Sequence, residues 1–226
     1  MTASQSALSA FDRPSVTVDL VMLTVVDGAL SVLVIRRDEA PALGEWALPG
    51  GFVHIDESIE QAVQRVLRYK ARLPGAFVEQ LYTFGAVDRD PRGRVISVAH
   101  YALVPHERLE AALAAAPDLA LARVKTPLPF DHAEIVGLAV KRLRGKLDYT
   151  AVGLELLPDR FPLRALQAVH EAILGHSLTK PAFRRKMLDR GYLEATGERE
   201  AAGAFRPAEL YRRAESHSSE RNNDHG

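Results

Sequence analysis

The segment from residue 49 to residue 65 constrains the fold more than any other part of the chain. It begins with the turn Pro-Gly-Gly-Phe, and five residues separate Gly51 from Glu57 and seven more separate Glu57 from Arg65. Ser58 with Gln61 has the spacing of a capping box, which predicts that a helix begins directly after Ser58. Apolar residues in this helix recur at i, i+3, i+4, i+7 and i+8, namely Ile59, Ala62, Val63, Val66 and Leu67. The segment therefore predicts a glycine-rich loop followed by an amphipathic helix whose apolar stripe packs on a sheet.

The sequence around this helix predicts strands. Residues 16–26 and 31–36 are apolar and rich in β-branched residues, and Asp27-Gly28 between them predicts a hairpin turn. Further strands are expected around residues 78–84 and 95–104, and helices around residues 108–116 and 132–146. Strands with helices interposed over about 150 residues are typical of one α+β sandwich. We assign residues 11–150 to this first domain.

The chain changes character near residue 151. Residues 161–174 form an apolar stripe at helical spacing, opened by Pro162 and ended by Gly175. A second helix is expected to begin after Thr179 and to stop at Gly191. A short strand at 192–194, a glycine-rich loop at 196–203 and a strand at 209–212 follow. This is the order of a winged helix-turn-helix, so we assign residues 151–213 to a DNA-binding domain and expect residues 214–226 to be a disordered tail.

Composition excludes several classes of protein. The chain has 226 residues, no cysteine and a formal net charge of zero. It lacks a basic, then apolar, secretory signal and any apolar run of the ~20 residues that a membrane span requires. We therefore expect a cytoplasmic protein without disulfides, thiolate metal sites or a membrane partner. Residues 155–213 hold 11 Lys and Arg against 8 Asp and Glu, a net charge of +3, which favours a phosphate-facing surface on the second domain.

The spacing Gly51, Glu57, Arg65 resembles the first half of the Nudix box. Ten segments, in order along the chain, resemble the Nudix-related transcriptional regulators of the NrtR family: residues 13–19, 33–37, 45–52, 81–85, 88–93, 130–135, 146–150, 155–158, 183–186 and 206–212. The resemblance implies a Nudix-type α/β/α sandwich followed by a C-terminal winged helix. It also implies a homodimer that binds a palindromic operator in double-stranded DNA. Its expected role is repression of NAD-biosynthesis genes in response to ADP-ribose or a related NAD-derived nucleotide.

The second half of the box departs from the active family. Nudix hydrolases carry metal-binding carboxylates at the positions held here by Val66, Tyr69 and Lys70, and a glycine at the position of Arg72. Positions 66, 69 and 70 share one helical face, so a phenol and an ammonium replace ligands of Mg²⁺ or Mn²⁺ there. At an effective dielectric constant near 20, Lys70 would repel each unit of positive charge at ~4 Å by about 4 kcal/mol. We predict no catalytic residues, no metal and no hydrolase activity, with Glu57 and Arg65 kept for structure.

The sequence nominates an effector site. Arg36, Arg37 and Lys70 could neutralise a diphosphate without metal, and Trp46, Phe52 and Tyr82 could stack on a base. Arg92 lies with Asp88 and Arg89 in a charged loop that either lines the pocket or caps a turn. Alternatives stay open: Trp46 and Phe52 could be core residues, the arginine pair could be solvated, and the domain could bind no ligand and only dimerise.

The DNA-binding residues are expected on the second helix of the winged domain and on its wing. With Thr179 at the helix start, Lys180, Arg184, Arg185 and Lys186 fall on the exposed side, whereas Phe183, Met187 and Leu188 face inward. Arginines there would contact guanine edges or phosphates, and Arg199 and Arg206 in the wing would contact the backbone. A two-fold dimer predicts half-sites separated by multiples of ~10 bp.

Three other functions compete with a nucleotide-responsive repressor. One is a regulator of a sugar-utilisation operon that senses a sugar phosphate. Another is a weakly active Nudix pyrophosphohydrolase, with metal held by Glu57 and downstream groups such as Glu79. The last is a DNA-binding scaffold that has no effector.

Overall fold

A mixed seven-stranded sheet organises the N-terminal part of the chain. The computed structural model describes residues 10–200 and 207–214. The strands are β1 (Ser15–Val26), β2 (Ala29–Arg36), β3 (Trp46–Ala47), β4 (Gly50–Phe52), β5 (Glu79–Phe84), β6 (Val95–Leu103) and β7 (Leu119–Arg123). Their order is β3-β2-β1-β6-β5, with β4 also paired to β1 and β7 to β2. The expected hairpin is confirmed: Val26 pairs with Ala29 around Asp27 and Gly28, whose φ angles are 49° and 69°.

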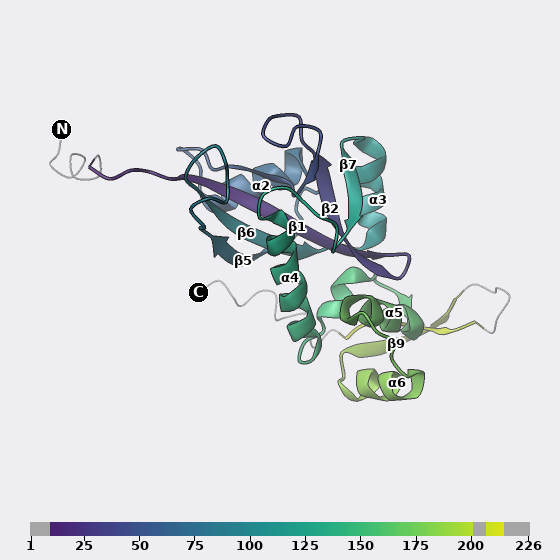
Figure 1. Ribbon diagram of the computed structural model, residues 1–226. Helices are drawn as coiled ribbons and strands as arrows, with labels where there is room; N and C mark the ends of the chain where they lie inside the picture. The colour runs from purple at the N-terminus through teal and green to yellow at the C-terminus, as the bar shows by residue number, and fades with distance from the viewer. Residues whose placement is uncertain (1–9, 201–206, 215–226) are drawn as a thin grey trace.

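Side chains of β1 alternate between the two faces of the sheet, as the pleat of a strand requires. Leu20 and Met22 pack in a cluster with helices α2 (Ile59–Tyr69) and α3 (His106–Ala115). Val21 and Leu23 pack in a second cluster with α4 (His132–Leu147). Figure 1 shows these helices on the sheet's opposite faces. The expected α/β/α sandwich is confirmed, and the strands at β3, β4 and β7 are additions that the sequence reading did not contain.

The capping box at the start of α2 is confirmed. The Gln61 backbone N–H donates to Ser58 Oγ at 3.2 Å, and the Ser58 N–H donates to Gln61 Oε1 at 2.7 Å. The residues predicted for the apolar stripe from Ala62 to Leu67 are buried. The helix therefore begins where the glycine-rich loop ends, and it presents its C-terminal turn to that loop.

The C-terminal part of the described chain is a winged helix. It comprises a 3₁₀ turn η1 (Val152–Leu156), β8 (Phe161–Pro162), α5 (Leu163–Leu174), α6 (Lys180–Asp189), β9 (Leu193–Arg199) and β10 (Glu209–Arg213), with strand order β8-β10-β9. Its core is made of six buried residues: Leu154, Phe161, Leu166, Phe183, Met187 and Tyr211. The expected helix-turn-helix and wing order is confirmed.

Three details of the second domain correct the sequence reading. Residues 161–162 form a strand rather than the first turn of α5, because Pro162 has the extended backbone of an N-cap residue. Thr196–Arg199 belong to β9, not to a loop, since they pair with β10. Leu188 is 39% exposed and does not face inward. Two buried residues, Phe183 and Met187, suffice to seat this ten-residue helix.

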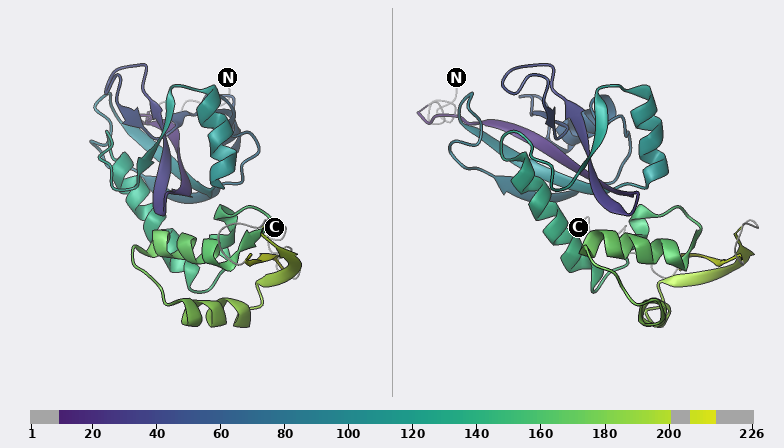
Figure 2. Two further views of the ribbon diagram at one scale, coloured as in Figure 1. Left: turned by 90° about the vertical axis from the view of Figure 1, so that its right-hand side faces the viewer. Right: turned by 45° about the vertical axis from the view of Figure 1, so that its right-hand side comes forward.

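The winged helix packs directly on the sandwich. Val169 and Ile173 of α5 join the apolar cluster of Leu143 and Leu147 of α4, so this core crosses the expected boundary near residue 150. Both views of Figure 2 show the winged helix, green to yellow, lying against the lower side of the sheet domain. None of the helices in the described ranges has the length and apolarity needed to cross a membrane. The expected tail lies outside the described residues except for Ala214, whose N–H donates to Tyr192 O at 3.0 Å.

Candidate functional site

Glu57 and Arg65 fasten the glycine-rich loop to α2. Arg65 donates from Nη2 and Nε to the two Glu57 oxygens at 2.5 and 3.0 Å, and from Nη2 to Phe52 O at 2.8 Å. Glu57 also accepts the His54 N–H at 2.8 Å. The hydrogen bond from Arg65, with the His54 N–H, lowers the pKa of Glu57 to about 2. Both oxygens of this carboxylate thus serve the loop conformation.

The face of α2 that carries carboxylates in the active family carries no carboxylate here. Val66 is buried against Gly51, and Tyr69 is 60% exposed. Lys70 Nζ donates to Gly50 O at 2.7 Å, and partial burial lowers the pKa of this lysine. An ammonium bonded to the loop carbonyl repels a cation, so this donor set does not fit the divalent metal that the Nudix fold implies.

Glu79 does not complete a metal site with Glu57. Its Oε2 accepts from Lys146 Nζ at 2.5 Å and from Tyr101 Oη at 3.0 Å. Within residues 10–200 and 207–214, no three His, Asp or Glu side chains are grouped so that they could hold a metal ion. Glu57 is therefore paired with Arg65, and Glu79 is paired with Lys146. Neither glutamate named in the hydrolase hypothesis is available to bind a metal ion.

A buried polar network surrounds Asp19 in the middle of β1. Ser97 Oγ on β6 donates to Asp19 Oδ2 at 2.5 Å, and Arg89 Nη2 lies 3.4 Å from the same oxygen. Arg89 also donates to both oxygens of Asp131, at 2.7 and 2.8 Å. A Cβ at Gly50 would lie 2.2 Å from Asp19 Oδ1, so glycine is required where β4 passes this carboxylate. The network ties β1, β4, β6, the loop before β6 and the start of α4 together.

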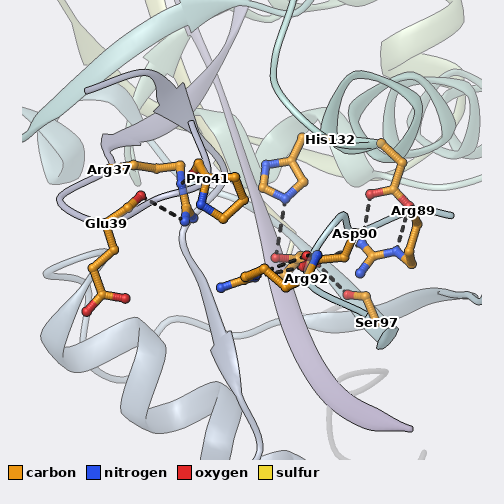
Figure 3. Close-up of polar contacts among 10 residues, drawn as sticks. Arg37, Glu39, Pro41, Arg89, Asp90, Arg92, Ser97 and His132 are labelled. Carbon is orange, nitrogen blue, oxygen red and sulfur yellow. Dashed lines mark hydrogen bonds and ion pairs between the residues drawn. The ribbon is translucent and has the colours of Figure 1, made fainter. Parts of the chain in front are cut away.

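His132 completes the network as a neutral imidazole. Its Nδ1 accepts the Leu48 N–H at 3.0 Å, which leaves the ring proton on Nε2, 3.7 Å from Asp19 Oδ1. Burial lowers the pKa of His132 although Asp19 and Asp131 act in the opposite direction. Figure 3 shows His132, Ser97 and Arg89 approaching β1 from different sides.

An open pocket of about 770 Å³ adjoins this network. Its wall comes from the end of β5, three loops and the first turn of α4: Pro41, Ala42, Tyr82, Thr83, Phe84, Gly85, Ala86, Asp88, Arg89, Pro91, Pro129, Phe130, Asp131 and Glu134. Phe130 has a left-handed φ of 59°. The Arg37 guanidinium lies 5.1 Å from the Phe130 ring centroid, and its Nε donates to Pro41 O at 2.8 Å. The pocket thus combines an aromatic wall with a cationic border.

The structure brings some of the nominated effector residues together and separates others. Tyr82 lines the pocket and Arg37 borders it. Arg92 bonds Asp90 at 2.7 and 3.0 Å and lies 5.0 Å from the centroid of Phe52. Electrostatic interactions with Glu39 link Arg92 and Lys70 to the loop that carries Arg37.

The remaining nominated residues are not part of the pocket wall. Arg36 donates to Gly44 O at 3.3 Å and pairs in the sheet with Trp46. Trp46 and Phe52 are 37% and 39% exposed, so neither is a core residue. The sequence pattern does not indicate a role for Asp19, Ser97, Asp131 or His132. Asp19 carried a usable signal, because a carboxylate inside an apolar strand must find a buried partner.

Helix α6 presents a basic face. Lys180, Arg184, Arg185 and Lys186 are exposed, as expected, and Thr179 occupies the N-cap position without a side-chain cap. Arg184 Nη2 donates to Tyr211 Oη at 3.3 Å, and Lys186 Nζ lies 3.7 Å from Asp148 Oδ1. The Arg185 side chain makes no hydrogen bond or ion pair to the described part of the chain. On the wing, Arg199 donates to Pro207 O at 3.2 Å, and Arg206 lies outside the described residues.

Two family models match the chain. Residues 13–135 match the NUDIX domain, and residues 153–213 match the NrtR DNA-binding winged helix domain. A curated relative from Acinetobacter baylyi, named ADPR responsive transcriptional repressor, is 36% identical over 92% of this chain and 86% of its own length. The chain belongs to the NrtR family. Its resemblance to this family, its fold and its winged-helix architecture are thereby confirmed.

Solved NrtR structures resemble the chain over both parts. Shewanella oneidensis NrtR complexed with a 27mer DNA is 36% identical, covers 88% of this chain and 93% of its own, and has a TM-score of 0.79. The NUDIX domain of the same NrtR complexed with ADP ribose is 35% identical, with a TM-score of 0.54 over 63% of this chain and 99% of its own. This NrtR-family chain is therefore similar to an NrtR whose structures contain DNA in one case and ADP ribose in another.

Proposed function

We propose that this chain is a ligand-responsive transcriptional repressor of NAD-biosynthesis genes that senses ADP-ribose or a related NAD-derived nucleotide. The proposal depends above all on the hydrogen bond from the Lys70 ammonium to Gly50 O. Lys70 occupies a position at which the active family has a metal-binding carboxylate. The same chain presents four basic side chains on the second helix of a winged helix. A protein that has a nucleotide-hydrolase fold, an unsuitable metal face and a DNA-facing helix is suited to sensing and not to hydrolysis.

The proposed effector site is the pocket at the first turn of α4. ADP-ribose carries an adenine, a diphosphate and two riboses. Phe130 and Tyr82 offer aromatic faces for the base, and Arg37 and Arg92 offer guanidinium groups for the diphosphate. Asp88 and Glu134 are exposed carboxylates in the pocket wall that can accept hydrogen bonds from ribose hydroxyls.

The proposed DNA site is the exposed face of α6 together with the wing. A helix seated in the major groove places Arg184 and Arg185 against base edges or phosphates, and Arg199 against the backbone. The protein acts as a homodimer on a palindromic operator in the cytoplasm. Occupation of the pocket changes the spacing of the two winged helices and releases the operator.

Gel-shift and calorimetric titrations test this function. The DNA is the duplex of highest affinity that the purified protein selects from a random library, and ADP-ribose, NAD and a panel of sugar phosphates are the ligands. ADP-ribose should weaken operator binding. Arg37→Ala should weaken the binding of ADP-ribose severalfold, whereas Arg68→Ala, on the exposed side of α2, should leave it unchanged. If a sugar phosphate weakens operator binding and no nucleotide does, the effector is a sugar phosphate and not an NAD-derived nucleotide.

Hydrolysis is tested separately. The protein is incubated with ADP-ribose and Mg²⁺, and AMP release is measured against a Nudix hydrolase run in parallel. We expect no release above the uncatalysed rate. Turnover that grows with protein concentration and is abolished by Glu57→Gln would show that the metal face works despite Lys70.

A further inference from the structure

Helix α4 contacts the proposed effector pocket with its first turn and the DNA-binding domain with its last. It has 16 residues, His132–Leu147, which corresponds to about 24 Å. Figure 1 shows it passing from the sheet to the level of α5, with α6 beyond. No other helix of the described chain is bonded to both regions in this way, so α4 is the helix that connects them.

The N-terminal end is clamped to the pocket. Asp131, at the N-cap position, forms the paired bonds with Arg89, and His132 accepts the Leu48 N–H. Phe130, Asp131 and Glu134 are also part of the pocket wall. A ligand that pushes on Phe130 or competes for Arg89 therefore acts directly on the first turn of α4.

The body of α4 is packed over its length. Its buried residues, Ile135, Val136, Ala139, Val140, Leu143 and Leu147, belong to one apolar cluster with β1 and β2. Packed helices move as units because protein interiors are close-packed. A displacement of the first turn is thus carried to the last turn.

The C-terminal end is held by a residue that immediately follows the DNA-facing helix. Arg190, the C-cap residue of α6, donates from Nη1 to Leu147 O at 3.1 Å and from Nη2 to Asp148 O. Carbonyls at a helix C-terminus lack intrahelical partners and carry the negative end of the dipole, so a guanidinium is well suited to bind them. Arg144 Nε adds a second contact, to Ile173 O of α5 at 2.7 Å.

We propose that Arg190 is a positioning residue that fastens α6 to the end of α4 and so transmits occupation of the pocket to the DNA-facing helix. The inference rests on the proposed function, because it concerns how that effector site regulates DNA binding. Arg190 is placed by two backbone carbonyls, whereas Arg185, five residues earlier, is free of ion pairs to the described chain and turns to solvent. Within α6 and its C-cap, Arg190 thus fastens the helix to α4, and Arg185 is left to contact DNA.

The experiment separates three quantities: ADP-ribose affinity, affinity for the selected duplex, and the factor by which ADP-ribose changes the latter. In the wild type we expect a factor in the range of roughly 5 to 150 that is typical of allosteric coupling. Arg190→Ala should bind ADP-ribose with unchanged Kd and bind the duplex within about threefold of wild type, but its coupling factor should fall to about two or less. Arg190→Lys should recover part of the factor, because one ammonium replaces the two-pronged guanidinium.

Arg108→Ala is the matched control. It removes a guanidinium that likewise donates to a backbone carbonyl, that of Pro74 at 3.2 Å, on α3 away from α4. The control should keep the wild-type factor. Hydrogen exchange of residues 180–190 gives a second readout, which should respond to ADP-ribose in wild type and in Arg108→Ala but not in Arg190→Ala.

The possible failures differ. A wild-type protein that does not respond to ADP-ribose overturns the proposed function and this inference with it. A normal response in Arg190→Ala, in coupling factor and in hydrogen exchange, overturns the inference alone. Loss of duplex binding by Arg190→Ala without any ligand also overturns it, since Arg190 would then belong to the DNA-binding surface or to the stability of the domain.

Discussion

Arg89 and Asp131 are joined by two parallel hydrogen bonds between the loop before β6 and the N-cap of α4. The Nε to Oδ2 distance is 2.8 Å and the Nη2 to Oδ1 distance is 2.7 Å, and the Arg89 side chain is 4% exposed. Asp19 shares the same guanidinium at 3.4 Å. One buried cation therefore serves two carboxylates, the buried Asp19 and the half-buried Asp131, while His132 beside them stays neutral. This pair positions the pocket wall relative to the sheet.

Removing Arg89 should destabilise the protein strongly. Arg89→Met preserves much of the side-chain volume but leaves Asp19 and Asp131 without their cation, and breaking a buried pair in this way costs about 3–5 kcal/mol. Arg160→Ala breaks the exposed pair with Glu198 and should cost less than about 1 kcal/mol. Urea denaturation at pH 7 measures both free energies of unfolding. Equal losses in the two variants would contradict the role given to the network.

Two glycine substitutions should change the stability of the protein in opposite directions. Gly50→Ala places a Cβ 2.2 Å from Asp19 Oδ1 and 2.8 Å from Val18 O, so β4 must shift and stability should fall. Gly145→Ala adds a Cβ with nothing within 4 Å, inside the exposed face of α4, and should raise stability by about 0.5–1 kcal/mol. Thermal unfolding of the two variants checks the signs. Stabilisation by Gly50→Ala would show that the loop is not fixed against β1.

His170 should make the winged-helix interface sensitive to acid. Burial, with Arg190 and Lys186 nearby, lowers its pKa from 6.5 to about 4. The unfolded chain binds this proton first, so the His170 contribution to stability is complete above pH 6.5 and is lost as the pH falls toward 4. The loss amounts to about 3 kcal/mol. In His170→Gln, the free energy of unfolding should decline less than in wild type between pH 6.5 and 4, and identical declines would contradict the assignment.

Arg185 should contribute to DNA affinity through a phosphate or a base. Its side chain is exposed and has no ion pair within the described ranges, so binding DNA breaks no internal bond. For a phosphate contact, Arg185→Ala should lower the slope of log K against log salt concentration by about 0.9. For a guanine contact, the loss should be about 1–3 kcal/mol and specific to one operator position. Fluorescence anisotropy at several salt concentrations distinguishes these, with Arg108→Ala as control. An unchanged affinity would remove Arg185 from the interface.

Sequence patterns predicted the features that depend on interactions between residues a few positions apart. The capping box at Ser58 and Gln61 fixed the start of α2, because its two hydrogen bonds join residues three apart. Asp27-Gly28 predicted the β1–β2 turn, since its left-handed angles suit these two residues. Phe183 and Met187 were recognised as the inward side of α6. The prediction that Leu188 faces inward was wrong. Its apolar character alone does not show how much of the α6 surface the rest of the domain covers.

The residues that surround the pocket could not be assembled from spacing. Asp19, Arg89, Asp131 and His132 come from three segments up to 113 positions apart. Each residue taken alone is an ordinary strand, turn or helix-start residue. Likewise, Arg190 reads as a surface arginine at the end of a helix. Only the packing of α5 on α4 and of α6 on α5 places its guanidinium against the Leu147 and Asp148 carbonyls.

The sequence by itself determined that the Nudix-type helix lacks the carboxylates of a metal site and that a basic helix lies in a winged domain. Residue identity and helical period, together with the resemblance to the Nudix box, are sufficient for both conclusions. The tertiary structure alone decided that Lys70 bonds Gly50 O, that Arg89 serves two carboxylates, and that one helix joins the pocket to the DNA-facing domain. Those relationships depend on which distant groups are brought out of water together, because a buried charge takes whatever partner the packed fold provides.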